Sequence, residues 1–290
     1  MNTIHPSASI SKNVQLGEDN EIGPGCVIEG PSALGSHNKL WMHVYVGPGT
    51  TVGDHNQIHM GAVIGHVPQD AAFTSCASST TVGSHNTIRE YVTIHRGAKE
   101  GTATVLGDHN FLMANAHIAH NCQVRNRVVL VNLATLAGYC VLEDGAFLSG
   151  LAALHQFTRV GRLAMVSGLS AVNKDVPPYM LCAGHMAVIQ GINVVGLRRA
   201  GVSAPVRQEI KHAYRLLYRS GLNVPHALEA IERECHSEEV QYLVAFVRAS
   251  ERGICAGLSA CAGGEEPTLP RKTIRAPLSD PEGLASEETA

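Results

Sequence analysis

Three residues of types that support acyl transfer recur along the chain at one spacing. His120, Gly138 and Gln156 follow one another at intervals of 18 residues. An accessible imidazole can take a proton from a hydroxyl group near neutral pH. A glycine lets a substrate approach the backbone closely, and its N–H can stabilise a developing oxyanion. If the fold stacks these residues, they predict acyl transfer without a covalent enzyme intermediate.

A six-residue repeat would stack them. Steps of six from Ile4 reach Ile, Leu or Val at every position as far as Ile64, and the phase continues over 82–94 and 106–172. A small or slim residue follows four positions later in most repeats. This pattern predicts a mostly β fold, a parallel β-helix in which three hexapeptides close one coil and aliphatic side chains form inward columns. Besides the first line of residues, the period aligns Asn121, Tyr139 and Phe157, and likewise Asn132, Gly150 and Gly168.

The repeat also carries a recurring turn. Segments that begin with Gly and end with Asn start at positions 17, 35, 53 and 107, which are whole coils apart. Gly and Asn tolerate positive φ, so one turn type is expected along one edge. His37, His55 and His109 belong to these turns and are expected to face solvent.

Two stretches interrupt the repeat. The regular Ile, Leu or Val at every sixth position is missing from Gly65 to Thr81 and from the Gly/Thr-rich stretch Gly97 to Val105. Both are predicted to leave the coil as loops, and long loops on a regular scaffold often carry function.

The repeat ends near residues 175–179, and the composition then changes. We predict a β-helix domain over 1–186, a C-terminal α-helical domain over 187–256 and a disordered tail over 257–290. Helices are expected over 205–220, 225–234 and 238–252. In the first of these helices, basic residues recur every four positions, at Arg207, Lys211, Arg215 and Arg219. They form either a solvated face or a docking strip for an acidic partner or a phosphate.

Composition excludes several classes of protein. The net charge of −3 does not fit nucleic-acid binding, and no apolar run of 18 residues predicts a membrane span. The first residues do not resemble a signal peptide. None of the eight cysteines forms a CxxC pair, and Cys26, Cys122 and Cys140 occupy slim positions of the repeat. We therefore expect buried thiols in a protein of the reducing cytoplasm.

Several motifs are similar to those of one enzyme family. The segments 115–122, 134–138, 155–157, 175–179, 191–199 and 213–221 resemble the UDP-N-acetylglucosamine O-acyltransferases of lipid A synthesis, over about residues 1–256. The resemblance implies a left-handed β-helix that forms a homotrimer, with active sites between subunits. It implies transfer of an (R)-3-hydroxyacyl chain from acyl carrier protein to the 3-hydroxyl of UDP-N-acetylglucosamine. No cofactor or metal is expected, because the donor brings its own phosphopantetheine.

The resemblance also implies roles for single residues. His120 matches the general base and Gly138 the oxyanion donor. The substrate-binding positions that the match adds are Gln69, Asp70, His117, Asn121, Tyr139, His155, Gln156, Asn193 and Arg199. Gly168 matches the position that limits acyl length, and a glycine there predicts an open groove and a chain of about C14.

The chain departs from the family at four positions, and alternatives remain. Asn121 stands where Asp is usual, Tyr139 and Met186 stand in place of His, and Ala72 in place of Lys. A variant acceptor with a 3-amino group, which would be N-acylated, is one alternative. A trimeric zinc hydratase resembling γ-carbonic anhydrase, with His117 and His120 as ligands, is another. A non-catalytic structural helix is the third.

Overall fold

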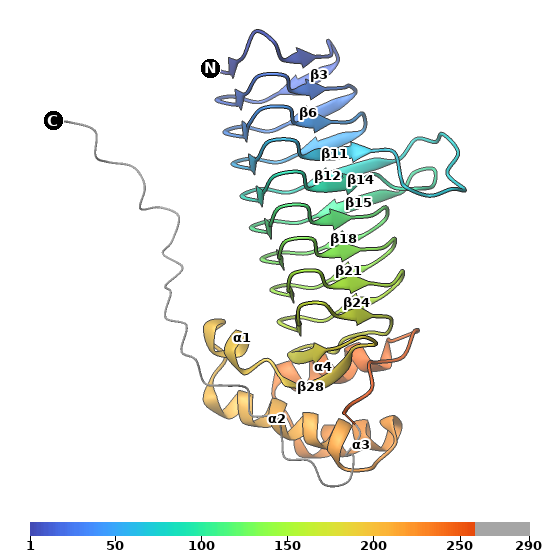
Figure 1. The fold of residues 1–290 in the computed structure, drawn as a ribbon. Coiled ribbons are helices and arrows are strands. Elements are labelled where there is room, and N and C mark those ends of the chain that lie inside the picture. The colour runs from blue at the N-terminus through green and yellow to red at the C-terminus, as the bar shows by residue number, and fades with distance from the viewer. Residues whose placement is uncertain (259–290) are drawn as a thin grey trace, which may run out of the picture. The chain divides into compact units, whose positions relative to one another are not determined.

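Each hexapeptide forms a short strand and a corner. Along the β-helix, each strand pairs in parallel with the strand three positions further along the chain, one coil away (Figure 1). The computed structural model describes residues 1–258, which form one compact unit. The predicted tail, apart from residues 257 and 258, lies outside the described residues. The three-sheet parallel β-helix that the repeat predicted is confirmed.

The strands belong to three sheets. The first sheet contains β1 (Thr3–Ile4), β4 (Glu21–Ile22), β7 (Lys39–Leu40), β10 (Gln57–Ile58), β13 (Thr87–Ile88), β16 (Phe111–Leu112), β19 (Val129–Leu130), β22 (Phe147–Leu148), β25 (Met165–Val166), β27 (Met180–Ala183) and β28 (Val188–Ile192). The second contains β2 (Ser9–Ile10), β5 (Val27–Ile28), β8 (Tyr45–Val46), β11 (Val63–His66), β14 (Thr93–His95), β17 (His117–Ile118), β20 (Thr135–Leu136), β23 (Ala153–Leu154) and β26 (Ala171–Val172). The third contains β3 (Val14–Leu16), β6 (Ser32–Leu34), β9 (Thr50–Val52), β12 (Ser79–Val82), β15 (Ala103–Leu106), β18 (Gln123–Val124), β21 (Val141–Leu142) and β24 (Arg159–Val160).

Three corners join these sheets, and the chain passes them in a fixed order. The first corner leads from the first to the second sheet, the second corner from the second to the third, and the third corner back to the first. The aliphatic columns are in register: Leu112 pairs with Leu130, and Leu130 with Leu148. These side chains are buried, so the columns form the core.

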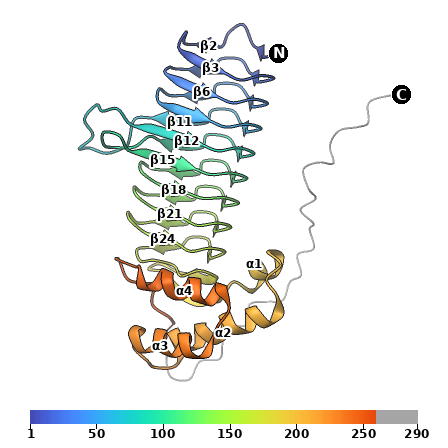
Figure 2. The ribbon, with the colours of Figure 1, turned by 180° about the vertical axis from the view of Figure 1, so that it is seen from behind.

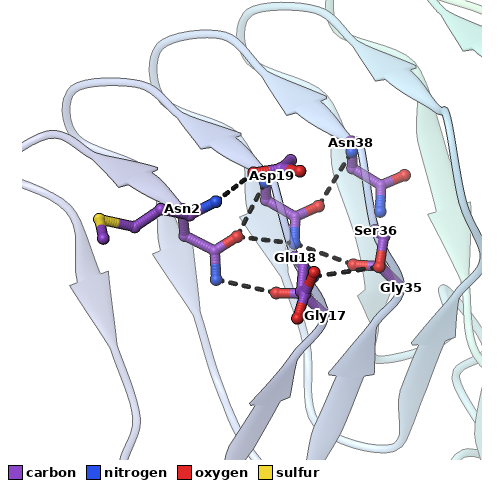
Figure 3. Close-up of polar contacts among 9 residues, drawn as sticks. Asn2, Gly17, Glu18, Asp19, Gly35, Ser36 and Asn38 are labelled. Carbon is purple, nitrogen blue, oxygen red and sulfur yellow. Dashed lines mark hydrogen bonds and ion pairs between the residues drawn. The ribbon is translucent and has the colours of Figure 1, made fainter.

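A ladder of buried asparagines holds the third corner of the N-terminal coils together (Figure 3). The backbone N–H of Asn38 donates to the side-chain oxygen of Asn20 at 2.9 Å. The Asn20 amide nitrogen donates to the Gly35 carbonyl at 2.9 Å. The same arrangement repeats through Asn56, and such bonds satisfy backbone groups that a sharp corner leaves unpaired.

The backbone angles of these turns differ from the expectation. Positive φ falls neither on the glycines that start the turn nor on its asparagines, but on the residue before each asparagine, with φ of 59° at His37 and 57° at His109. The histidines do face solvent, as predicted, and their rings stack from coil to coil at 4.7–4.8 Å, through His85 as well.

Both interruptions of the repeat are loops, as predicted. The first connects β11 to β12 and the second connects β14 to β15, and both leave the coil on the same side (Figures 1 and 2). The register resumes beyond them, because Ile58 pairs with Ile88 and Ile88 with Leu112. The insertions therefore lengthen two coils without disturbing the aliphatic columns.

The C-terminal part contains α1 (Val194–Arg199), α2 (Ala204–Arg219), α3 (Val224–Glu234) and α4 (Glu238–Arg248). Ser203 and Asn223 accept backbone hydrogen bonds at the starts of α2 and α3, as helix caps do. α1 was not predicted, and α4 ends before the predicted residue 252. Strand β28, antiparallel to β27, extends the first sheet into the range predicted to be helical. None of the helices in residues 1–258 is long and apolar enough to span a membrane.

Candidate functional site

The predicted column lies on the second corner. His117 pairs with Thr135, and Thr135 with Ala153, so His120, Gly138 and Gln156 follow one another one coil apart. A Cβ added to Gly138 would lie 2.5 Å from Cε1 and 2.7 Å from Nε2 of His120. Only a glycine therefore lets the imidazole ring pack against the next coil. Within residues 1–258 the Gly138 N–H has no hydrogen-bond acceptor.

Asn121 fixes the orientation of the His120 ring. The Asn121 side-chain oxygen accepts the Ala98 N–H at 2.9 Å, which identifies it as the oxygen because a backbone N–H can only donate. The same oxygen lies 3.0 Å from Nδ1 of His120. In the neutral ring, Nδ1 must therefore carry the proton, which leaves the lone pair on Nε2. This is the tautomer that a general base needs.

Aromatic rings extend the wall beside His120. The Tyr139 ring meets the His120 ring edge-on at 5.3 Å, and Phe157 stacks on Tyr139 at 4.8 Å. Phe157 is exposed. Tyr139, one of the departures from the family pattern, thus contacts the candidate base directly.

His117 lies on the neighbouring strand, and its environment differs from that of His120. Its Nδ1 lies 2.7 Å from the Thr93 hydroxyl. Burial, with a smaller contribution from His95, lowers the pKa of His117 to about 4. His117 is therefore neutral at physiological pH, which suits a hydrogen-bonding residue better than a proton acceptor.

His95 lies beside His117 in the candidate site, and the sequence did not point to it. It is buried between His66 and His117, with ring centroids 6.3 Å and 5.3 Å away, and its Nδ1 bonds the Val67 carbonyl. Burial lowers its pKa. The two loops break the 18-residue count on either side of His95, so stepping by coils passed over it. The 24-residue register between Thr93 and His117 would have found it.

The first loop carries Gln69, Asp70 and Ala72. Gln69 and Ala72 are exposed, and the Asp70 carboxylate accepts the Ala72 N–H at 2.9 Å. The loop starts from His66, beside the histidine cluster of the second sheet. This position is compatible with the predicted role of Gln69 and Asp70 toward the substrate, and that role stays a prediction.

His155 and Gln156 follow two coils below His120 along the second corner. Both side chains are exposed, and Nδ1 of His155 lies 3.2 Å from the Gln156 carbonyl. They extend the same wall, where a ligand could reach them.

Gly168 lies on a different edge. It belongs to the first corner, where it is exposed beside Leu169, and a Cβ there would lie 3.2 Å from the Gly150 carbonyl. Met186, another departure, is also exposed. The structure thus places the acyl-length position and the candidate base on the two edges that flank the second sheet.

Asn193 is the N-cap of α1 and Arg199 is its last residue, and Asn193 bonds the third corner at Leu163. Asn193 is buried: its side-chain oxygen accepts the Gly196 N–H at 3.0 Å, and its nitrogen donates to the Leu163 carbonyl at 2.8 Å. Asn193 therefore caps α1 in this chain, whereas Arg199 is exposed. Neither is brought to His120 within one chain.

The remaining predictions concern charge, thiols and metal. On α2, Lys211 and Arg215 are exposed and have no carboxylate partner within residues 1–258, whereas Arg207 bonds the Val202 carbonyl and Arg219 the Tyr214 hydroxyl. Cys26, Cys122 and Cys140 are buried free thiols, as predicted. Across the described part of the chain, no three His, Cys, Asp or Glu side chains are grouped as metal ligands.

Comparison with known proteins shows which family the chain belongs to. The family described as "UDP N-acetylglucosamine O-acyltransferase; Domain 2" matches residues 175–255. Acyl-[acyl-carrier-protein]–UDP-N-acetylglucosamine O-acyltransferases from Halorhodospira halophila and Thermodesulfovibrio yellowstonii are 41% and 42% identical to the chain. Both matches cover 88% of this chain, and they cover 99% and 100% of those proteins.

Solved structures give the same result. The UDP-N-acetylglucosamine acyltransferase of Bacteroides fragilis superposes with a TM-score of 0.84 at 38% identity, covering 87% of this chain and 99% of that one. The enzyme of Acinetobacter baumannii also gives 0.84, at 36% identity and with the same coverage. The chain belongs to the acyl-[acyl-carrier-protein]–UDP-N-acetylglucosamine O-acyltransferases and is an acyltransferase.

Proposed function

We propose that this chain transfers an (R)-3-hydroxyacyl group from acyl carrier protein to the 3-hydroxyl of UDP-N-acetylglucosamine, the first step of lipid A synthesis. The observation that carries the proposal is the contact of His120 with Gly138, in which Asn121 leaves Nε2 free as a proton acceptor. The names of the relatives supply the donor and acceptor.

The chemistry follows from these positions. Nε2 of His120 takes the proton of the sugar hydroxyl as its oxygen attacks the thioester carbonyl. The Gly138 N–H stabilises the oxyanion of the tetrahedral intermediate. When the intermediate collapses, the thiolate of the carrier arm leaves and takes the proton back from the imidazolium. The protons balance in this sequence of steps. The proposal includes no metal and no prosthetic group of the enzyme's own, because the donor brings its phosphopantetheine.

A left-handed β-helix that assembles as a homotrimer is part of the proposal. The candidate residues occupy all three corners of the prism, with His120 on the second, Gly168 on the first and α1 near the third. One chain does not gather them. The first corner also carries exposed apolar side chains that a neighbouring subunit would cover, namely Met42, Tyr91, Leu133, Leu151 and Leu169.

Mixing variants tests this assembly. We expect trimers by native mass spectrometry, and His120→Ala chains refolded with Arg199→Ala chains should regain about a quarter of wild-type activity if each site takes one residue from each of two subunits. A monomer, or no recovery in mixed trimers, would contradict a shared site.

The donor side of the site rests on two features. Gly168 lies three coils from His120, about 14 Å along the axis, and its missing side chain leaves room for a chain of about C14. The exposed Lys211 and Arg215 of α2 suit the acidic surface of a carrier protein. A cytoplasmic location follows from this partner and fits the buried free thiols.

Product analysis tests the proposed function. Purified enzyme is incubated with 3-hydroxyacyl carrier proteins of several lengths and either UDP-N-acetylglucosamine or its 3-amino analogue, and products are identified by mass. We expect an ester on UDP-N-acetylglucosamine with the long donor. If product forms only as an amide on the amino analogue, the proposed acceptor is wrong. A preference for C10 donors would contradict the proposed chain length of about C14. Stoichiometric zinc with hydratase activity would contradict the proposed reaction.

A further inference from the structure

The two loops that interrupt the repeat, the first loop at 67–78 and the second loop at 96–102, are bonded to each other. The Ala77 N–H donates to the Glu100 carboxylate at 2.9 Å, and the Gly101 N–H donates to the Ala77 carbonyl at 2.8 Å. The Arg96 guanidinium also lies 5.8 Å from the centre of the Phe73 ring. Figure 2 shows the loops side by side, away from the rest of the coil.

The second loop also reaches the candidate base. Its Ala98 N–H donates to the Asn121 side-chain oxygen, the same oxygen that holds Nδ1 of His120. The Asn121 N–H in turn donates to the Thr104 hydroxyl at 2.8 Å, just beyond the loop. A chain of contacts therefore runs from the first loop through the second loop to the His120 ring.

We propose that the second loop is a positioning element that couples the first loop to His120. When the sugar nucleotide occupies the first loop, at Gln69 and Asp70, the bonds through Glu100 and Ala98 hold the imidazole in its productive orientation. This inference rests on the proposed function for its substrate. Each link is a hydrogen bond at or near the surface, and such a segment opens easily when one link is removed.

Glu100 offers the cleanest variant, because its exposed side chain touches neither His120 nor the sugar positions. Glu100→Ala should raise KM for the sugar nucleotide and also lower kcat, about threefold each, so that kcat/KM falls about tenfold. Glu100→Gln keeps an acceptor oxygen and should restore most of this loss. Lys99→Ala is the matched control: the Lys99 side chain is exposed and makes no polar contact within residues 1–258, so activity should not change.

A double-mutant cycle separates coupling from a local effect on the first loop. If the loop acts through Asn121, Glu100→Ala should lower kcat/KM less than threefold in an Asn121→Ala background. An unchanged tenfold loss there, or a change in KM alone, would overturn the proposal.

Hydrogen exchange gives a readout that needs no turnover. Glu100→Ala should speed amide exchange about tenfold in both loops, and Lys99→Ala in neither. Faster exchange confined to the first loop would contradict the coupling. If the two variants show this exchange pattern while the wild-type enzyme forms no product, the proposed function is refuted and the coupling stays in place.

Discussion

The side-chain oxygen of Asn121 accepts hydrogen bonds from both the Ala98 N–H and the His120 ring. An amide serves this geometry as well as a carboxylate would, because only the acceptor oxygen is used. What it lacks is the negative charge that would stabilise a protonated imidazole. At the scale of single residues, the departure at Asn121 therefore concerns the strength of the base and not its orientation.

Asn121→Asp tests this distinction. The carboxylate would favour the protonated ring, so the acid limb of the kcat/KM profile should move to higher pH by about one unit. The measurement is kcat/KM from pH 5 to 9 for both proteins, with circular dichroism as the check on folding. An unmoved acid limb would mean that His120 is not the titrating base.

His117 should make stability depend on pH. Its pKa of about 4 in the folded chain lies below the ordinary value of 6.5. Between these values the unfolded chain binds more protons, so stability falls as the pH drops from 6.5 toward 4. In His117→Gln this fall should be smaller by about 1 kcal/mol at pH 5, allowing for partial exposure. Urea midpoints at pH 5 and pH 7.5 measure it, and equal falls in the two proteins would contradict the assignment.

At the scale of elements, the asparagine ladder and the two loops have different roles, one in stability and the other in positioning polar residues. The ladder gives the N-terminal coils a rigid third corner, while the second sheet and its corners carry the polar site. Asn56 lies in the middle of the ladder, and its side chain bonds Asn38, Gly83 and the N–H of Asn86. Removing it leaves several buried polar groups without partners.

Asn56→Ala should lower the free energy of unfolding by about 2–4 kcal/mol. Gln57→Ala, a change at the exposed neighbour, should stay within about 0.5 kcal/mol of the wild-type value. Denaturant unfolding of both variants measures the difference. A similar small effect in both would show that the ladder adds little to stability.

At the scale of the whole molecule, the periodicity predicted most of the fold because every sixth residue of the repeat from Ile22 to Val172 is a buried aliphatic residue. The columns through Leu112 and Leu130, and the line from His120 to Gly138, follow directly from counting. The turn chemistry did not. Leu133, Tyr139 and Leu151 adopt positive φ, which propensity disfavours, because pairing with the coils on either side holds each corner in place.

Contacts made by irregular backbone could not be predicted either. The Ala98 N–H that reaches Asn121 belongs to a loop with no period, and no residue type marks a backbone donor. Asn193 was expected to hold a nucleotide. Its motif gave no sign that its side-chain oxygen would cap α1 while its side-chain nitrogen donates to the Leu163 carbonyl. The repeated strands and columns could thus be predicted from the sequence. The contacts of the loops that interrupt the repeat are seen only in the structure.

Replacing the candidate base tests the central claim most directly. Single-turnover transfer from a long 3-hydroxyacyl carrier protein to UDP-N-acetylglucosamine is measured for wild type and His120→Ala, with circular dichroism and native mass as controls. The rate of transfer should fall by about 10²–10⁴-fold, while fold and assembly stay unchanged. Substantial turnover by correctly folded His120→Ala would show that another group takes the proton and would contradict the assignment of the active site.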